Sequence, residues 1–396
     1  MTSILFAWEL GGGYGHLVPI ATLAQSLVER GHSVKAIVRD VHRATSVFAD
    51  IDLQFVQAPV KLHYGEPPFP IATTFAQVLR NTAIDKVGPC RARTKSWLRL
   101  IASFDPDLII CDHSPTALLA SRCLGLSSAS LGIGFSCPAQ ESPLRNLRSW
   151  VAFDEQRAVE DEEQTLRVAN EVLTSLGASS LDRLCDLYPM PANTLLCTFS
   201  EFDPYVPRQE ACYLGPWNRD GRLTVEWPQL KHANIFVYLN WSSGAAKLLA
   251  ALAKKRCNVL AFIPGTPEEQ LKKCCSDGVQ VFREPIALSR LLSECDLVIC
   301  HGNLVTSSQA LLSATPALLL PNILEHRLNA ECIERLGAGL IAAPDVSKCE
   351  LQIDELLEGG PYLDRAREFA HKHRDHSQQA QVELATDQIE RILGQR

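Results

Sequence analysis

The stretch Trp8–His32 reads WELGGGYGHLVPIATLAQSLVERGH, and its order of residue types decides the fold class. An apolar run, Ser3–Leu10, ends in three glycines, and apolar residues then recur at helical spacing until Gly31. This pattern predicts a buried strand, a tight turn and a helix that stops at a glycine. The strand–helix order continues through the runs SVKAIVRD, PDLIICD and SSASLGIG. We therefore expect an α/β domain with a doubly wound parallel sheet.

A second strand–helix series begins after a stretch without periodicity. Pro216–Ala233 contains proline, glycine and charged residues, which favours a linker. The apolar runs NIFVYLN, NVLAFIP, LVICHGN and PALLLPN follow, and helical patterns alternate with them. We expect two Rossmann-like domains that face each other across a cleft, with ligands at the carboxyl ends of the strands. The predicted boundaries are 1–216 for the first domain, 217–233 for the linker, 234–375 for the second domain and 376–396 for a last helix that packs back on the first domain.

Residues 136–195 differ from the rest of the first domain because they are polar, charged and helical in pattern. We treat them as a helical insertion in that domain. Two interpretations stay open at this point. The insertion either forms an acceptor pocket or lid, or it is a solvated pair of helices.

Composition excludes several classes of protein. The chain has 396 residues, of which 46% are hydrophobic and 21% are charged, as in soluble proteins with sizeable cores. A net charge of -7 argues against a nucleic-acid surface, because no excess of Lys and Arg is present to neutralise phosphates. The 14 cysteines include no CxxC pair, so we expect reduced thiols in a cytoplasmic protein. We expect no signal peptide, because the N-terminus lacks a basic region and a long apolar core, and no transmembrane segment, because no apolar run reaches about 18 residues.

The first candidate site lies at the carboxyl edge of the first sheet. A GxGxxG dinucleotide motif counted from Gly11 would need glycine at position 16, where the chain has His16. His16 either caps or packs within its helix, or acts as a base at this edge. Asp112 ends a later strand, where it could orient an imidazole or cap the next helix. His113 is the competing histidine, but continued strand geometry would point its side chain the other way.

The second candidate site lies in CHGNLVTSSQALLSATPALLLPNILEHRLNA, Cys300–Ala330. A strand ends at His301 and Gly302, and a helix begins near Thr306. Free N–H groups at a helix N-terminus, next to hydroxyls and a glycine, bind anions, and phosphate is the expected anion. Further on, Glu325 could accept hydrogen bonds from sugar or ribose hydroxyls.

These motifs resemble those of GT-B glycosyltransferases of family 1, the UDP-glycosyltransferase-like kind, over nearly the whole chain. The family pattern GHxxP is similar to Gly15–Pro19, and HGGxxTxxEAxxxGxPxLxxPxxxDQxxNA is similar to 301–330. The resemblance implies an inverting hexosyltransferase that uses a nucleoside-diphosphate sugar and a small, partly apolar acceptor with a hydroxyl group. It also implies that His16 is the base and that Asp112 is its partner.

The resemblance assigns the remaining site residues. The expected donor-binding residues are Asn240, Ser242, Pro285, His301, Gly302, Asn303, Thr306, Ser307, Gln309, Glu325 and His326. The expected acceptor-binding residues are Tyr14, His63, Tyr64 and Phe135. Among the positions that depart from the family pattern, Asn303, Gln309 and His326 stand in place of glycine, glutamate and glutamine. Because imidazole has less reach than glutamine and can gain a proton near neutral pH, we expect His326 to move donor preference from UDP-glucose toward a deoxyhexose or an amino sugar.

The departures leave two other functions open. The chain could be a non-catalytic nucleotide-sugar-binding or auxiliary partner protein, or a nucleotide-sugar epimerase of the same fold. For any of these we expect no metal, because the one Asp-x-Asp sequence considered, 105–107, starts a strand of the first domain. We also expect no cofactor beyond the nucleotide sugar itself.

Overall fold

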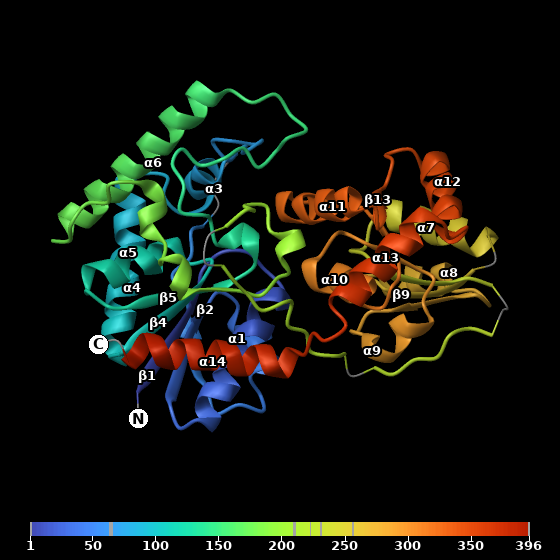
Figure 1. The fold of residues 1–396 in the computed structure, drawn as a ribbon, viewed down its shortest axis with the longest axis horizontal. Coiled ribbons are helices and arrows are strands. Elements are labelled where there is room, and N and C mark those ends of the chain that lie inside the picture. Colours follow the sequence, from blue (N-terminus) through green and yellow to red (C-terminus); the bar gives the residue numbers. More distant parts are fainter. Residues whose placement is uncertain are drawn as a thin grey trace. The chain divides into compact units, whose positions relative to one another are not determined.

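The computed structural model describes residues 2–62, 66–208, 211–221, 223–229, 232–255 and 257–394. Contacts divide the chain into two compact units, one of Met1–Trp217 with Ser377–Arg396 and the other of Asn218–His376. Each unit is built on one parallel sheet with helices beside it (Figure 1). The two units are described separately below.

The first unit contains a seven-stranded sheet in the order β3-β2-β1-β4-β5-β6-β7, in which all neighbouring strands are parallel. Its strands are β1 (Ser3–Trp8), β2 (Ser33–Val38), β3 (Gln54–Gln57), β4 (Leu108–Asp112), β5 (Ser128–Gly132), β6 (Thr194–Leu196) and β7 (Cys212–Tyr213). Its helices are α1 (Tyr14–Glu29), α2 (Val41–Val47), α3 (Phe75–Thr82), α4 (Val87–Phe104), α5 (Pro115–Cys123), α6 (Glu155–Ser175) and α14 (Gln378–Gly394). Because helices cover both faces of such a sheet, β1 and β4 are almost wholly buried, and they are apolar except for Ser3 at the start of β1 and Asp112 at the end of β4.

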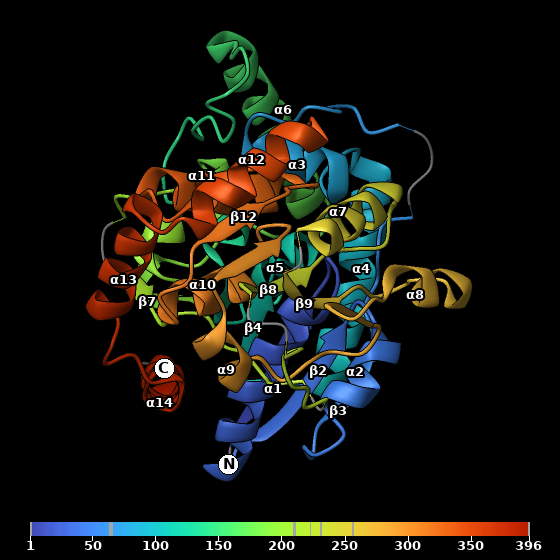
Figure 2. The same cartoon turned by 90° about the vertical axis from the view of Figure 1, so that its right-hand side faces the viewer.

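The last helix of the chain belongs to the first unit. α14 lies alongside α1, and both views show the two helices together (Figures 1 and 2). The apolar face of α14, which includes Ala385 and Ile389, joins the core formed by α1 and the sheet. Polar contacts accompany this packing, since the Ser26 and Thr386 hydroxyls lie 2.8 Å apart and Arg30 pairs with Glu390 at 2.7 Å.

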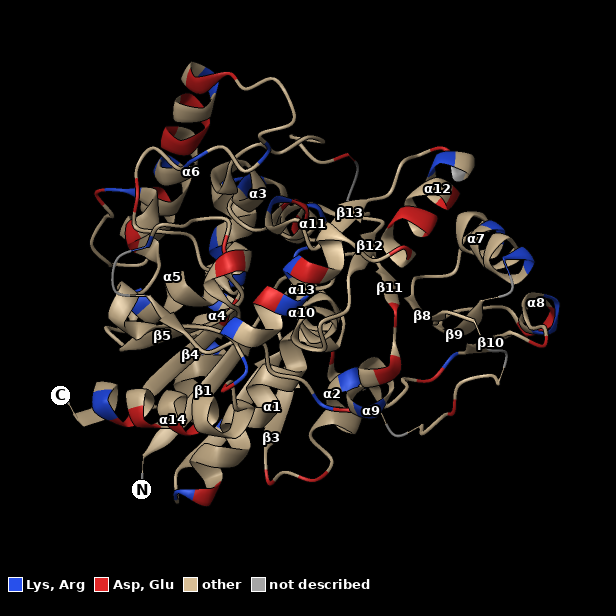
Figure 3. Ribbon diagram, turned by 45° about the vertical axis from the view of Figure 1, so that its right-hand side comes forward, with Lys and Arg blue, Asp and Glu red and all other residues tan. Residues whose placement is uncertain are grey.

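The segment 136–195 contains one long helix and not a helical pair. α6 presents charged residues of both signs to solvent (Figure 3), with Arg157 and Arg167 near carboxylates one turn away. Its other face is buried, and there Gln77 of α3 donates a hydrogen bond of 2.8 Å to Asp161. The rest of the segment is irregular chain with short 3-10 turns.

The second unit contains a six-stranded parallel sheet in the order β10-β9-β8-β11-β12-β13. Its strands are β8 (Asn234–Tyr238), β9 (Asn258–Phe262), β10 (Val279–Phe282), β11 (Leu297–Cys300), β12 (Ala317–Leu319) and β13 (Gly339–Ile341). Its helices are α7 (Ser243–Lys254), α8 (Glu268–Cys274), α9 (Leu288–Leu291), α10 (Leu304–Leu312), α11 (Leu324–Leu336), α12 (Val346–Leu357) and α13 (Pro361–Lys372). In both sheets the chain order reverses beside a central strand, β1 or β8, which is where such folds bind ligands. No helix among the described residues is long and apolar enough to cross a membrane.

Candidate functional site

His16 and Asp112 meet at the carboxyl edge of the first sheet. Trp8 and Asp112 are register partners on the adjacent strands β1 and β4, and His16 lies in the first turn of α1. The His16 Nδ1 atom is 2.8 Å from Asp112 Oδ2, and the two side chains are 12% and 4% exposed. The imidazole also stacks on the Trp8 indole, with ring centroids 5.2 Å apart. Packing and hydrogen bonding therefore hold this dyad in one orientation.

The hydrogen bond fixes the chemistry of the His16 ring. An ionised carboxylate only accepts hydrogen bonds, so His16 Nδ1 carries the proton and Nε2 carries the basic lone pair. The second carboxylate oxygen, Asp112 Oδ1, is buried and has no hydrogen-bond partner among the described residues. The imidazole of His16 is therefore the hydrogen-bond partner of the Asp112 carboxylate, whose charge can stabilise an imidazolium.

Gly11 explains why glycines precede this helix. It has a φ of +83°, a left-handed conformation that glycine adopts without strain. A Cβ atom at this position would lie 2.2 Å from His16 Nε2. Gly11 therefore leaves room for the basic nitrogen of His16.

His113 occupies an aromatic cluster beside the dyad. The strand geometry assumed from the sequence ends at Asp112, because His113 is left-handed with a φ of +43°. Its ring lies 6.4 Å from His16 and packs near Phe75 and Phe135, at 6.1 and 6.0 Å between centroids. Burial, with a smaller effect of His16, lowers the pKa of His113 to about 3. His113 is therefore neutral near pH 7 and is a poor general base there.

The predicted acceptor residues are only partly within the described chain. Phe135 packs edge-on against Phe75 in the cluster beside His113, with centroids 5.7 Å apart. Tyr14, at the start of α1, is 48% exposed, and the Arg43 guanidinium lies 6.0 Å from its ring. His63 and Tyr64 lie outside the described residues. An acceptor role for all four stays a prediction.

Glu9 is a buried carboxyl group that the sequence interpretation overlooked. It directly follows β1, is fully buried, and accepts hydrogen bonds from the Thr116 N–H (2.9 Å) and the Thr116 hydroxyl (2.6 Å). Burial raises its pKa to about 7, although these bonds and the charge of Arg93 act in the opposite direction. The signal in the sequence is a single acidic residue inside the apolar run SILFAWEL.

This raised pKa predicts a pH-dependent stability. The folded state holds the Glu9 proton more tightly than the unfolded state, so the carboxyl group favours folding at low pH, and this contribution is lost as the pH rises from about 4.5 through about 7. We expect the free energy of unfolding to fall by about 3 kcal/mol over that range because of Glu9 alone. Denaturant unfolding of the wild type and of Glu9→Gln at several pH values measures the difference. If the free energies of unfolding of the two proteins changed with pH in parallel, the raised pKa of Glu9 would be contradicted.

The anion site predicted in the second unit lies where β11 leads into α10. Asn303 precedes α10 and its side chain makes no hydrogen bond to the first turn, so this residue does not cap the N–H groups there. Gly302 has a φ of +89°, and a Cβ atom on it would lie 2.6 Å from the His326 carbonyl oxygen. Asn329 Nδ2 donates a 3.0 Å hydrogen bond to the Gly302 carbonyl. These contacts explain why glycine stands at position 302 and asparagine at position 329, two residues shared with the family pattern.

The remaining donor candidates divide into partly exposed and buried groups. Ser242 caps α7 by accepting a hydrogen bond from the Ala245 N–H at 3.1 Å. Asn240 and Pro285 are exposed, and Gln309 and Glu325 are partly buried. Thr306 is buried in the first turn of α10. Ser307 is fully buried, with its hydroxyl 3.5 Å from the Cys300 sulfur, so its contact is with the core.

His326 does not behave as the sequence suggested. Its Nδ1 atom lies 2.7 Å from the Asn322 side-chain oxygen, and its ring is stacked parallel to that of His301 at 5.9 Å. Burial, together with the neighbouring His301, lowers the pKa of His326 to about 4. The expected gain of a proton near neutral pH is therefore wrong, because an imidazole in this position stays neutral.

The buried Thr306 hydroxyl provides a test of the anion site. We expect Thr306→Val, which keeps the shape of the side chain, to weaken the binding of a nucleoside diphosphate by about 1–3 kcal/mol, the range for a lost hydrogen bond to a charged group. Titration calorimetry with UDP and dTDP measures the change. The control is Thr45→Val in α2 of the first unit, an exposed threonine whose hydroxyl bonds its own helix. If the two variants bound nucleoside diphosphate equally well, the phosphates would not bind at the first turn of α10.

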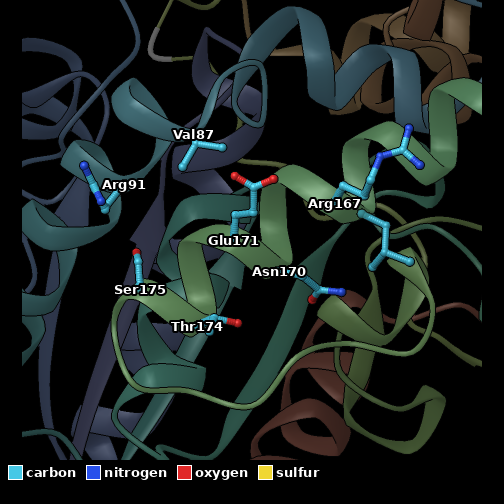
Figure 4. Close-up of a pocket in the computed structure, with 8 residues that line it drawn as sticks. Val87, Arg91, Arg167, Asn170, Glu171, Thr174 and Ser175 are labelled. Carbon is cyan, nitrogen blue, oxygen red and sulfur yellow. The ribbon is translucent and has the colours of Figure 1, made fainter.

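One surface hollow lies apart from these residues. It is formed by α4 and α6 and is lined by Val87, Arg91, Leu166, Arg167, Asn170, Glu171, Thr174 and Ser175 (Figure 4). None of the predicted site residues lines it. Among the described residues, no group of three or more His, Cys, Asp or Glu side chains is placed to hold a metal ion, and metal independence stays a prediction.

Comparisons with known proteins bear on the fold and on the class of protein. No family profile matches the chain. A PGL/p-HBAD biosynthesis glycosyltransferase of Mycobacterium tuberculosis is 24% identical over 295 residues, which cover 69% of this chain and 68% of that protein. A PGL/p-HBAD biosynthesis rhamnosyltransferase of Mycobacterium bovis is 27% identical over 271 residues, or 63% of this chain and 59% of that protein.

Solved structures match over almost the whole length. The glycosyltransferase of kitacinnamycin has a TM-score of 0.73 at 17% identity and covers 99% of both chains. The glycosyltransferase VinC, solved in complex with dTDP, has a TM-score of 0.66 at 16% identity and covers 99% of this chain and 100% of its own. The spinosyn rhamnosyltransferase SpnG has a TM-score of 0.63 at 15% identity and covers 98% and 100%.

Two parallel Rossmann-like sheets and these structural matches define a GT-B protein, which confirms the predicted fold class. The relatives in sequence are glycosyltransferases as well. The resemblance predicted from the motifs and the prediction of a glycosyltransferase enzyme are therefore confirmed.

Proposed function

We propose that this protein is an inverting glycosyltransferase that moves a deoxyhexose from a nucleoside diphosphate, dTDP in particular, to a hydroxyl group of a small, partly apolar acceptor. The observation that carries the proposal is the His16–Asp112 dyad at the carboxyl edge of the first sheet. An auxiliary protein that only binds nucleotide sugars would not need a histidine held by a buried carboxylate in this place.

The dyad supplies general base catalysis. His16 Nε2 takes the proton of the acceptor hydroxyl as its oxygen attacks the anomeric carbon, and Asp112 stabilises the imidazolium that forms. This contribution is worth about 10²–10⁴-fold in rate. A single displacement of this kind inverts the anomeric configuration.

The first turn of α10 supplies electrostatic stabilisation of the leaving group. The diphosphate gains negative charge as the glycosidic bond breaks, and uncapped N–H groups at a helix N-terminus stabilise such charge. The Thr306 hydroxyl provides a further hydrogen-bond donor in the same turn. Positioning and electrostatics then lower the barrier without a metal ion.

The comparisons and His326 support the choice of donor. Two of the compared proteins are named as rhamnosyltransferases, and one structure was solved with dTDP. His326 stands where the family pattern has glutamine, and its neutral imidazole, whose Nδ1 contacts the Asn322 oxygen, leaves Nε2 as an acceptor at shorter reach. Fewer hydrogen bonds to the sugar favour a hexose that lacks a hydroxyl group.

The acceptor surroundings support a partly apolar substrate. The partly exposed Phe135 packs on the buried rings of Phe75 and His113 beside the dyad, and Tyr14 presents an exposed ring at the start of α1. Such rings bind apolar bodies and leave polar atoms to be oriented by a few hydrogen bonds. These two accessible rings support an acceptor with an apolar part next to its hydroxyl group.

The test is a panel of nucleotide sugars read first by thermal shift and then by turnover. We expect dTDP-rhamnose and related deoxysugar nucleotides to stabilise the protein more than UDP-glucose, and a ligand at about 100 Kd to contribute about 2.7 kcal/mol. His326→Gln should narrow or reverse this preference. UDP-glucose as the best donor of both proteins would refute the assignment of the donor, whereas tight binding without turnover on any acceptor would favour the auxiliary role.

A further inference from the structure

A buried ion pair of the first unit joins Asp203 and Arg208, in the chain between β6 and β7. Asp203 is fully buried, and the Arg208 side chain is almost wholly buried. The guanidinium group donates hydrogen bonds to both oxygens of the carboxyl group, with 3.0 Å between Nη2 and Oδ1. The Tyr213 hydroxyl donates to Oδ2 at 2.7 Å, and the Tyr205 N–H donates to Oδ1 at 3.0 Å. Each oxygen of Asp203 therefore has two hydrogen-bond partners.

Stability alone does not explain such a pair. Taking two charges out of water costs about as much as their attraction returns, and well-packed apolar residues of similar volume often stabilise a protein equally well. What the pair adds is direction, because the planar guanidinium group fixes the groups at each end of its fork. The other acceptor of Arg208 therefore shows what the pair holds in place.

That acceptor is Gly134, which the ion pair holds from two sides. Arg208 Nη2 donates a hydrogen bond of 3.2 Å to the Gly134 carbonyl oxygen. A Cβ atom on Gly134 would lie 2.6 Å from Asp203 Oδ1 and 3.1 Å from Asp203 Cα, so only a glycine allows this close approach. Gly134 begins the 3-10 turn Gly134–Ser136, just after β5. The ion pair therefore fixes the start of this turn.

The turn places Phe135 beside the dyad. The partly exposed ring of Phe135 lies 6.0 Å from the ring of His113, which lies 6.4 Å from the ring of His16. The backbone just before the turn also approaches the dyad, since a Cβ atom on Gly132 would lie 3.3 Å from Asp112 Oδ1. A shift of the turn would therefore move the Phe135 ring relative to the base.

The segment 203–208 has support of its own. The ring of Tyr205 is fully buried, and the guanidinium groups of Arg208 and Arg145 lie 4.9 and 5.8 Å from its centre. Arg145 Nη1 also donates a hydrogen bond of 3.0 Å to the Val206 carbonyl oxygen. The ion pair therefore ties the turn to a segment that further contacts hold.

We propose that Asp203 and Arg208 are positioning residues of the acceptor site, which set the place of the Phe135 ring beside His16 and so determine how tightly an apolar acceptor binds. The pair acts through Gly134 and Phe135. This inference rests on the proposed function, because it assumes that an acceptor binds at Phe135. It predicts an effect on acceptor affinity and none on nucleotide affinity, since the anion site at α10 belongs to the other unit.

Two variants disturb the contact from opposite sides. Arg208→Lys keeps the positive charge but lacks the planar fork that reaches both Asp203 and Gly134. Gly134→Ala keeps every charge and places a Cβ atom 2.6 Å from Asp203 Oδ1. The probe is 2-naphthol, a small apolar molecule with one hydroxyl group. We expect each variant to raise its Kd about fivefold or more in a fluorescence titration, the size of a lost aromatic contact, and to leave the Kd of dTDP unchanged in calorimetry.

Three further variants make the test specific. Arg183→Lys is the control for the first substitution, because Arg183 is exposed and pairs with Asp186 at 2.6 Å. Gly88→Ala is the control for the second, because a Cβ atom there meets no atom within 4 Å. Both controls should bind 2-naphthol as the wild type does. Phe135→Leu should weaken binding, and adding Arg208→Lys to it should cost little more if the pair acts through that ring.

The outcomes separate this inference from the proposed function. Unchanged 2-naphthol affinity in Arg208→Lys and Gly134→Ala would overturn it, as would additive losses with Phe135→Leu or equal losses for 2-naphthol and dTDP, which a merely structural role produces. Circular dichroism checks folding, and Gly134→Ala decides alone if Arg208→Lys does not fold. A wild type that does not bind 2-naphthol would also refute the positioning role. If 2-naphthol binds in the expected pattern but no nucleotide sugar glycosylates it, the positioning role stands and the proposed function fails.

Discussion

His16→Ala is expected to lower kcat by at least about 10²-fold on any acceptor that the wild type uses, with nucleotide affinity nearly unchanged. The variant removes the nitrogen that takes the acceptor proton, whereas the anion site at α10 belongs to the other unit. The imidazole of His113, whose ring lies 6.4 Å from that of His16, is a poor replacement because burial lowers its pKa to about 3. Steady-state kinetics on the best donor, with calorimetry of dTDP binding, measure both effects.

The dependence of His16 on Asp112 is tested in the same assay. If Asp112 acts only through His16, then Asp112→Asn lowers kcat, and adding it to His16→Ala costs little more. Additive losses would mean that the two residues act separately. Normal turnover by His16→Ala would remove the histidine from the mechanism altogether.

Gly11→Ala should be nearly as damaging, although glycine carries no chemistry. The added Cβ atom would lie 2.2 Å from His16 Nε2, so the imidazole must move from its place beside Asp112. The φ of +83° adds strain of about 1–3 kcal/mol, and the melting temperature should fall as well. We expect a loss of kcat of about the size predicted for His16→Ala, because a displaced base contributes little.

Gly12→Ala is the matched control for this substitution. A Cβ atom on Gly12 meets no atom within 4 Å, and its φ is not in the left-handed range. We expect that variant to keep most of the activity and stability. If Gly11→Ala were as active as Gly12→Ala, the space around His16 Nε2 would not matter to catalysis.

The arrangement of strands made much of the fold and of the dyad predictable. In a parallel sheet the carboxyl ends of the strands share one edge, so a histidine after β1 and an aspartate at the end of β4 must lie near each other. The apolar runs mark those strands without ambiguity because parallel sheets are buried on both faces. The spacing in Trp8–His32 was therefore enough to place His16.

Other features depend on side-chain environments that a pattern cannot encode. Ser307 is adjacent to Thr306 in the motif, but one step along a helix rotates a side chain by about 100°, and this step turned it into the core. The chain leaves strand geometry at His113 because this residue has a left-handed conformation. Glu9 and His326 have shifted pKa values because of burial, which only the tertiary structure defines.

The packing of α14 on α1 has a consequence for how the chain is made. The core of the first unit includes Ala385 and Ile389, which a ribosome adds only after the entire second unit has been synthesised. Until then α1 lacks its neighbour, and its apolar surface stays open to chaperones or to other chains. The second unit is one continuous segment of the chain and can fold before the first unit is complete. The packing of the helix that carries His16 is therefore completed last. A substitution near residue 385 would disturb the carboxyl edge of the first sheet, although it lies at the other end of the sequence.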